Sequence, residues 1–208
     1  MNNGNSFIYV VDDNVSICRA LTILLRSHGF KVETFTRASD FLAFKHPKLP
    51  SCLVLDIQLP DINGLDLQEA MAARKLIIPI IFITGHGDIP MSVRGMKAGA
   101  IDFLPKPVTA KKLLNAVTLA ISKSKIQNKE LAEISKIKRR IKTLSPRELE
   151  VFRLVANGML SKQIAYKRGT ALQTIKVHRS RVMQKMKAET VTELIHFANK
   201  AGITSSKT

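Results

Sequence analysis

Five polar side chains each follow a short apolar run, and their types suit chemistry on a phosphoryl group. The carboxylates are Asp12, Asp13 and Asp56, the hydroxyl belongs to Thr84 and the ammonium to Lys106. Crowded carboxylates repel one another, which predicts raised pKa values or a bound cation. An all-oxygen ligand set suits Mg²⁺, which keeps waters and a phosphate oxygen in its shell. A hydroxyl and an ammonium opposite the metal would complete a cradle for phosphoryl oxygens, which need donors and positive charge.

The elements that must position these side chains alternate along residues 5–122. Apolar runs bounded by turn residues predict strands at 7–11, 31–35, 51–56, 80–84 and 102–104. Helical spacing of apolar residues predicts helices at 15–28, 38–44, 65–74, 90–97 and 110–121. Five alternating strands and helices imply a doubly wound α/β fold with a parallel sheet. Such a sheet gathers the five polar residues at the carboxyl ends of its strands.

These five positions, in this order on one α/β pattern, resemble the receiver domain of two-component response regulators, which has a flavodoxin-like fold. The resemblance implies that Asp56 is the phosphoacceptor and that a sensor histidine kinase is its donor. It also implies that Mg²⁺ is held by Asp12, Asp13, Asp56 and the backbone carbonyl of Gln58. Thr84 and Lys106 would contact the phosphoryl oxygens, and Phe103 matches the aromatic residue whose burial reports phosphorylation in this family. Rim residues Gln58 and His86 could influence the lifetime of the acyl phosphate.

Charge divides the chain of 208 residues into two unlike halves. Residues 1–122 hold 13 basic and 10 acidic side chains, whereas residues 123–208 hold 20 basic and 6 acidic ones. A strongly basic second half predicts contact with a polyanion, and the alternative is a basic surface that is only solvated.

Cys18 and Cys52 have no metal or redox spacing, so we expect them to be reduced packing residues. No apolar run reaches the roughly 18–20 residues needed to span a membrane, and we expect a cytoplasmic protein without a membrane partner.

Residues 123–142 are expected to form a helical, basic linker between a domain at 1–122 and another at 143–208. Leu131, Ile134, Ile137 and Ile141 have helical spacing. An amphipathic helix packing on its neighbour is one interpretation, and a dimerising seam or a signalling rod is another. The pattern is too short to establish a coiled coil.

Residues 143–208 predict four helices, at 146–156, from Ser161, at 172–187 and at 191–201. Ser145, Pro146 and Glu148 form the pattern of a capping box, and Ser161 could cap the second helix. Two helices joined by a short glycine-containing turn, the second one basic, are typical of a helix-turn-helix. The runs Leu-Ser-Pro-Arg-Glu, Ala-Asn-Gly, Lys-Gln-Ile-Ala and Thr-Ile-Lys-Val-His-Arg resemble the LuxR-type helix-turn-helix of the FixJ/NarL class.

By this resemblance the third helix enters the major groove of double-stranded DNA, and the last helix is the usual dimer surface. The apolar stripe Ile175, Val182 and Met186 should face the domain core. Two departures from the class stand at Arg168, usually apolar, and at Ala171, usually Ser or Thr. Thr170 could cap the third helix instead, or the cap could be lost at about 1 kcal/mol. The candidates for contact with DNA are Thr174, Lys176, Val177, Arg179, Ser180 and Arg181.

The two resemblances together predict a response regulator that becomes a dimer on phosphorylation and activates transcription, with RNA polymerase as an expected partner. We expect no enzymatic activity beyond the phosphoryl transfer to the chain itself and its own dephosphorylation. An Asp-nucleophile phosphatase is rejected, because that chemistry wants a second acid where Gln58 stands. A DNA-binding protein whose receiver acts through protein contacts without phosphorylation remains an alternative.

Overall fold

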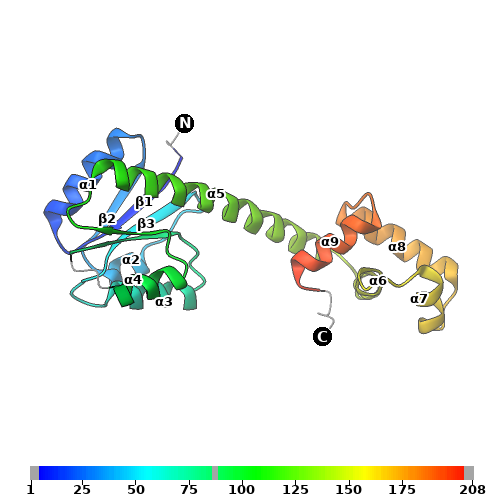
Figure 1. Ribbon diagram of the computed structural model, residues 1–208. Coiled ribbons are helices and arrows are strands. Elements are labelled where there is room, and N and C mark those ends of the chain that lie inside the picture. The colour runs from blue at the N-terminus through cyan, green and yellow to red at the C-terminus, as the bar shows by residue number, and fades with distance from the viewer. Residues whose placement is uncertain (1–4, 86–88, 204–208) are drawn as a thin grey trace. The chain divides into compact units, whose positions relative to one another are not determined.

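The computed structural model describes residues 5–85 and 89–203, which form two compact units that divide between Asn128 and Lys129. The first unit contains a sheet that helices flank (Figure 1). The sheet has five parallel strands in the order β2-β1-β3-β4-β5. This order confirms the predicted doubly wound sheet. The strands are β1 (Phe7–Val11), β2 (Lys31–Phe35), β3 (Ser51–Asp56), β4 (Ile80–Thr84) and β5 (Asp102–Pro105).

Helices cover both faces of this sheet because each parallel crossover carries the chain over one face. On one face, Leu21 of α1 and Val117 of α5 pack in a core with Ile8 and Val54. On the other face, Phe41 of α2 and Met71 of α3 are buried in the second core of this unit. Predicted and observed helix ends agree to within two residues, except at the end of α5. The helices are α1 (Val15–Ser27), α2 (Ala38–Ala43), α3 (Gly64–Ala73), α4 (Ile89–Lys97) and α5 (Ala110–Ile141).

The helix α5 does not end near Ile121, as the sequence pattern predicted, but continues to Ile141. No Gly or Pro interrupts this stretch, so nothing local stops the helix. Ser124 is buried and its hydroxyl accepts a hydrogen bond from the backbone N of Ser51, so packing on the first unit extends beyond Ile121. In the second unit Ile137 is buried in the core. This burial supports the interpretation of the 123–142 pattern as an amphipathic surface that packs on its neighbour.

The second unit adds four helices to the end of α5. They are α6 (Pro146–Ala156), α7 (Ser161–Arg168), α8 (Leu172–Met186) and α9 (Val191–Ala201). Their shared core is apolar and includes Phe152, Ile164, Val182, Met186 and Leu194. Between α7 and α8 the chain turns at Gly169, whose φ of +58° lies in the left-handed region that favours glycine. Two helices joined by this short turn confirm the predicted helix-turn-helix.

The N-terminal ends of α6 and α7 are capped in different ways. The predicted capping box of α6 is present, since the Ser145 hydroxyl accepts from the N of Glu148 and the Glu148 carboxylate accepts from the N of Ser145. The prediction that Ser161 caps α7 is wrong. Leu160 stands at the cap, and its backbone N donates to Oε1 of Gln163, while Ser161 is already helical. The Ser161 hydroxyl lies 3.1 Å from Nη1 of Arg179 instead.

None of the helices in the described part of the chain is long and apolar enough to cross a membrane.

Candidate functional site

Parallel strand register places the predicted acidic and basic residues together at one edge of the first unit. Val11 pairs with Leu55, and Asp56 pairs with Ile83, so β1, β3 and β4 end side by side. Thr84 pairs with Pro105, which brings Lys106 to the same edge. The Nζ atom of Lys106 lies 2.8 Å from Oδ2 of Asp12 and 2.8 Å from Oδ2 of Asp56. Residues nearly a hundred positions apart thus share one ion-pair network.

Backbone amides fix the remaining oxygens of the two buried carboxylates. Oδ1 of Asp12 accepts from the N of Asn14 at 2.9 Å, and Oδ1 of Asp56 accepts from the N of Gln58 at 3.3 Å. Asp12 is 2% exposed and Asp56 6% exposed. Because each carboxylate is held at both oxygens, its rotamer is determined before any ligand arrives. The role of the Gln58 carbonyl toward a metal remains a prediction.

The electrostatics of the site centre on Lys106. Partial burial of the ammonium acts to lower the pKa of Lys106, because it disfavours the charged form. Hydrogen bonds and Coulomb attraction from Asp12 and Asp56 outweigh that desolvation, and the pKa of Lys106 lies above its ordinary value. Lys106 therefore remains a cation at neutral pH and stays paired with both carboxylates.

The donor set fits a divalent cation. One oxygen from each of Asp12, Asp13 and Asp56 lies within 4.8 Å of the other two. Three carboxylates against one ammonium leave the site with a formal charge of −2, and hard carboxylate oxygens are the ligands that Mg²⁺ prefers. Asp13 is exposed, so one side of the cluster is open to solvent and to a phosphoryl group.

Thr84 and Phe103 occupy the adjoining strands at this edge. Thr84 is 5% exposed, and its backbone carbonyl accepts a hydrogen bond of 2.8 Å from the N of Lys106. The ring of Phe103 is half-buried, with its centroid 4.7 Å from that of Phe82. His86, the predicted rim residue, lies outside the described residues.

Two glycines matter here in a way that sequence reasoning missed. A Cβ atom on Gly64 would lie 2.6 Å from the carbonyl oxygen of Asp56, so α3 begins against the backbone of Asp56. A Cβ atom on Gly95 of α4 would lie 2.6 Å from Cε2 of Phe103. For Gly95 the available signal was a glycine inside a helical pattern, which sometimes marks close packing, but its partner Phe103 lies on another element.

The candidate DNA-binding residues lie on α8 in the second unit. Ile175, Val182 and Met186 are buried, as the stripe predicted. Arg179 is half-buried and donates to the Ser161 hydroxyl, because four residues after Ile175 the helix has turned back toward the core. Arg179 is therefore not on the same exposed face as the other candidates. That face carries Thr174, Lys176, Val177, Ser180 and Arg181.

The two departures from the LuxR-type pattern have structural outcomes. Nη2 of Arg168 lies 2.7 Å from Oε2 of Glu150, so the guanidinium at a usually apolar position is paired with a carboxylate of α6. Ala171 is the N-cap of α8 and provides no side-chain hydrogen bond. Of the two alternatives predicted for this end, the loss of the cap is the one observed.

Comparison with known proteins agrees with both units. Residues 8–118 match the response regulator receiver domain, and residues 142–198 match the bacterial regulatory proteins of the luxR family. The chain is 44% identical over 203 residues to nodulation protein W of Bradyrhizobium diazoefficiens, covering 98% of this chain and 89% of that protein. It is 36% identical over 195 residues to the transcriptional regulatory protein FixJ of Rhizobium meliloti, covering 94% and 96% of the two chains.

Solved structures support the same assignment. The response regulator StyR has a TM-score of 0.80 at 42% identity, with 94% of this chain and 99% of that chain covered. Full-length FixJ from B. japonicum has a TM-score of 0.55 at 36% identity, with 96% and 98% covered. Receiver site, helix-turn-helix and relatives agree, and the chain belongs to the two-component response regulators, with a LuxR-type DNA-binding domain that makes it a transcription regulator.

Proposed function

We propose that a partner histidine kinase phosphorylates Asp56 and that this modification promotes dimerisation and DNA binding and activates transcription. The observation that carries the proposal is the shared ammonium of Lys106, 2.8 Å from oxygens of both Asp12 and Asp56. A cation held in this way over a buried carboxylate supplies the positive charge that transferring phosphoryl oxygens need. Names of relatives such as the transcriptional regulatory protein FixJ add support.

In the proposed transfer, a carboxylate oxygen of Asp56 attacks the phosphorus of a phosphohistidine on the kinase. A P–O bond forms as the P–N bond breaks, and the electron pair stays on the imidazole nitrogen, which takes a proton from solvent. Lys106 pairs with the phosphoryl oxygens, and the Thr84 hydroxyl donates a hydrogen bond to them. Mg²⁺, held by Asp12, Asp13, Asp56 and the Gln58 carbonyl, would neutralise developing negative charge. The chain would catalyse only this transfer and the hydrolysis of its own acyl phosphate.

The response would pass from Phe103 to the face formed by α4, β5 and α5. Exposed apolar side chains on this face are the observation that supports dimerisation there. Val93 of α4 is 44% exposed, Met96 46% and Leu119 of α5 61%. Apolar side chains on one exposed face favour contact with a second copy. A dimer would present two copies of α8 to the major groove of a two-fold DNA site. RNA polymerase is the expected partner in activation.

The experiment compares the full chain in Mg²⁺ with and without beryllofluoride, measuring molar mass by light scattering and affinity for duplex DNA. We expect beryllofluoride to raise the molar mass and the DNA affinity of the wild type. The same increases are expected for Asp40→Asn, which removes an exposed carboxylate of α2. Asp56→Asn should lose both responses. If Asp56→Asn responds like the wild type, or the wild type dimerises without any phosphoryl mimic, regulation through protein contacts alone replaces this proposal.

A further inference from the structure

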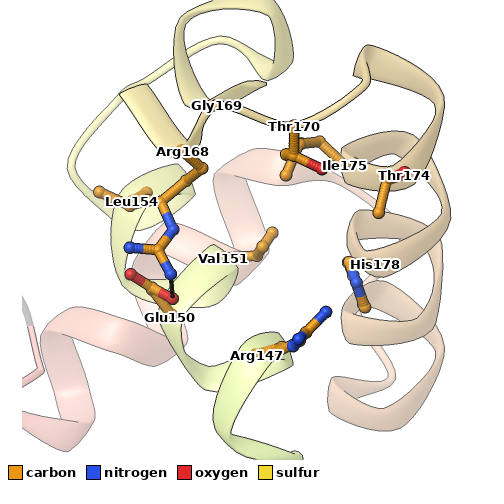
Figure 2. A pocket seen from close by; sticks show the side chains of 10 residues that line it. All are labelled: Arg147, Glu150, Val151, Leu154, Arg168, Gly169, Thr170, Thr174, Ile175 and His178. Carbon is orange, nitrogen blue, oxygen red and sulfur yellow. Dashed lines mark ion pairs between the residues drawn. The ribbon is translucent and has the colours of Figure 1, made fainter. Parts of the chain in front are cut away.

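We propose that a cavity in the DNA-binding unit is a binding site for an anion of the phosphate class. The cavity, about 320 Å³ in volume, lies between α6, the turn before α8 and the first half of α8 (Figure 2). Its volume is at the lower end of that of small-molecule sites. The polar residues that line it are Arg147, Glu150, Arg168, Thr170, Thr174 and His178.

The charges around the cavity favour an anion. Oε2 of Glu150 lies 2.7 Å from Nη2 of Arg168, and this ion pair neutralises the one carboxylate of the lining. Arg147 lines the same cavity and has no ion-pair partner within residues 5–85 and 89–203. A guanidinium presents a planar fork of N–H donors that matches the oxygens of phosphate. The lining therefore contains Arg147, whose charge is not compensated by an ion pair among the described residues, and Arg168, whose charge is shared with Glu150.

The start of α8 supplies further donors at this place. The first N–H groups of a helix have no partner inside the helix and carry a partial positive charge. At α8 the N-cap is Ala171, which makes no side-chain cap hydrogen bond. Thr170 and Thr174, on either side of this cap, also line the cavity, and each has a hydroxyl group. An oxyanion at this end of the 15-residue helix would fill the role that a capping side chain leaves open.

His178 lines the cavity and carries a buried nitrogen without a hydrogen-bond partner in the described part of the chain. Its Nδ1 atom is buried and has no hydrogen-bond partner among the residues that the structure describes. Buried polar atoms are almost always paired, so an unpaired one calls for a water, an ion or a ligand as partner.

Apolar side chains complete the lining. Val151 and Leu154 of α6 and Ile175 of α8 contribute carbon surface. This mixture suits a phosphate ester, whose organic part contacts carbon while its oxygens meet Arg147 and Arg168, better than it suits bare phosphate. Two sources offer that chemistry: a small phosphate monoester, or a diester of the DNA backbone that reaches the cavity from the exposed face of α8.

The test titrates the full chain with inorganic phosphate and with phenyl phosphate, at constant ionic strength and without Mg²⁺. Amide resonances of Thr170 and Thr174 and the ring resonances of His178 are followed by NMR. We expect saturable shifts with both probes and tighter binding of phenyl phosphate, because its ring adds contact with Leu154 and Ile175. Shifts that do not saturate, or that match those produced by chloride, would overturn the proposal.

Variants separate a built site from general attraction to a basic protein. Arg147→Gln should weaken the binding of phenyl phosphate at least about tenfold, the value expected for a lost charged hydrogen bond. Arg153→Gln makes the same charge change on the exposed side of α6, away from the lining, and should leave the dissociation constant unchanged. Glu150→Gln should tighten binding, because it removes the negative charge and frees Arg168. A gain of affinity cannot arise from misfolding, and equal losses in the two arginine variants would contradict the site.

The salt dependence of DNA binding then identifies the source of the phosphate. If the DNA backbone occupies the cavity, Arg147→Gln should make the slope of log K against log salt about 0.9 less negative than it is for Arg153→Gln. Duplex DNA should also displace phenyl phosphate. If the occupant is a small ester, the two variants should have equal slopes, and the duplex and phenyl phosphate should bind together. None of these measurements depends on phosphorylation of Asp56.

Discussion

Gly95 of α4 gives the ring of Phe103 the space that it occupies: a Cβ atom on Gly95 would lie 2.6 Å from Cε2 and 2.9 Å from Cζ of Phe103. The same ring packs against Phe82, at 4.7 Å between centroids. The proposed switch residue thus contacts both a strand residue and a helix backbone. Any larger residue at position 95 must displace the ring or move α4.

We therefore expect Gly95→Ala to destabilise the first unit. Overpacking a core contact costs about 1–3 kcal/mol, against about 1 kcal/mol gained from the helix propensity of alanine. In a Phe103→Ala background the clash with the ring is absent and the contact with Cδ2 of Leu65, at 3.2 Å, remains, so the same substitution should become less destabilising or stabilising. Native-state hydrogen exchange of β4 amides measures both steps of this double-mutant cycle. Stabilisation by Gly95→Ala in both backgrounds would show that the ring adapts without cost.

Gly64→Ala should be more damaging, because the neighbours of its Cβ are backbone atoms. That Cβ would lie 2.6 Å from the carbonyl oxygen of Asp56 and 2.9 Å from Cα of Ile57, neither of which can turn away. We expect a loss of about 2–4 kcal/mol, at or beyond the upper end of overpacking costs, and slower phosphorylation of Asp56.

Gly85→Ala is the matched control for that substitution. It lies next to Thr84, and its Cβ would meet nothing within 4 Å. Hydrogen exchange of β3 amides and phosphorylation by a small phosphodonor compare the two variants. Equal effects of both would contradict the close approach at Gly64.

Removal of Lys106 should increase the stabilisation that Mg²⁺ provides. The ammonium occupies Oδ2 of both Asp12 and Asp56 and so competes with a cation for their charge. Lys106→Met leaves the carboxylates repelling one another, which lowers stability without metal and raises metal affinity. Thermal unfolding at increasing Mg²⁺ should show a larger rise in Tm for Lys106→Met than for the wild type, and almost none for Asp13→Asn. An unchanged rise in all three proteins would exclude this acidic cluster as the metal site.

The buried carboxylate of Glu148 should make the stability of the second unit depend on pH in acid. Hydrogen bonds from Lys185, 2.6 Å away, and from the N of Ser145 lower the pKa of Glu148 from 4.5 to about 2. Because folding depresses this pKa, the stabilisation is complete above about pH 4.5 and is lost as the pH falls toward 2. Its size is on the order of 2 kcal/mol after allowance for the partly exposed lysine.

Glu148→Gln should retain the packing but lose that pH dependence, and hydrogen exchange of α8 amides between pH 2 and 5 measures it. Glu130→Gln, which neutralises an exposed carboxylate of α5 in the same unit, should behave like the wild type. If the stability of Glu148→Gln falls with pH in acid as that of the wild type does, other carboxylates of the unit cause the pH dependence.

Local signals in the sequence predicted most element boundaries but failed where packing decides. The spacing of apolar residues predicts that α5 ends near Ile121, whereas Ser124 and Ile137 continue to pack on the first and second units, respectively. Ser161 looked like a cap because of its residue type, but its hydroxyl contacts Arg179 of another helix. Arg168 departed from the family pattern without a local reason, and its partner Glu150 is eighteen residues away.

The sequence by itself determined the order of strands and helices, the gathering of Asp12, Asp56 and Lys106 at one sheet edge, and the buried stripe of α8. These follow from residue spacing, since apolar periodicity sets the elements and parallel strands end at a common edge. Only the tertiary structure decided that Lys106 bridges two carboxylates, that Gly95 makes room for Phe103, and that a cavity with two arginines opens beside α8. Such contacts join residues distant in the chain, and their distances depend on how side chains fill the space between elements.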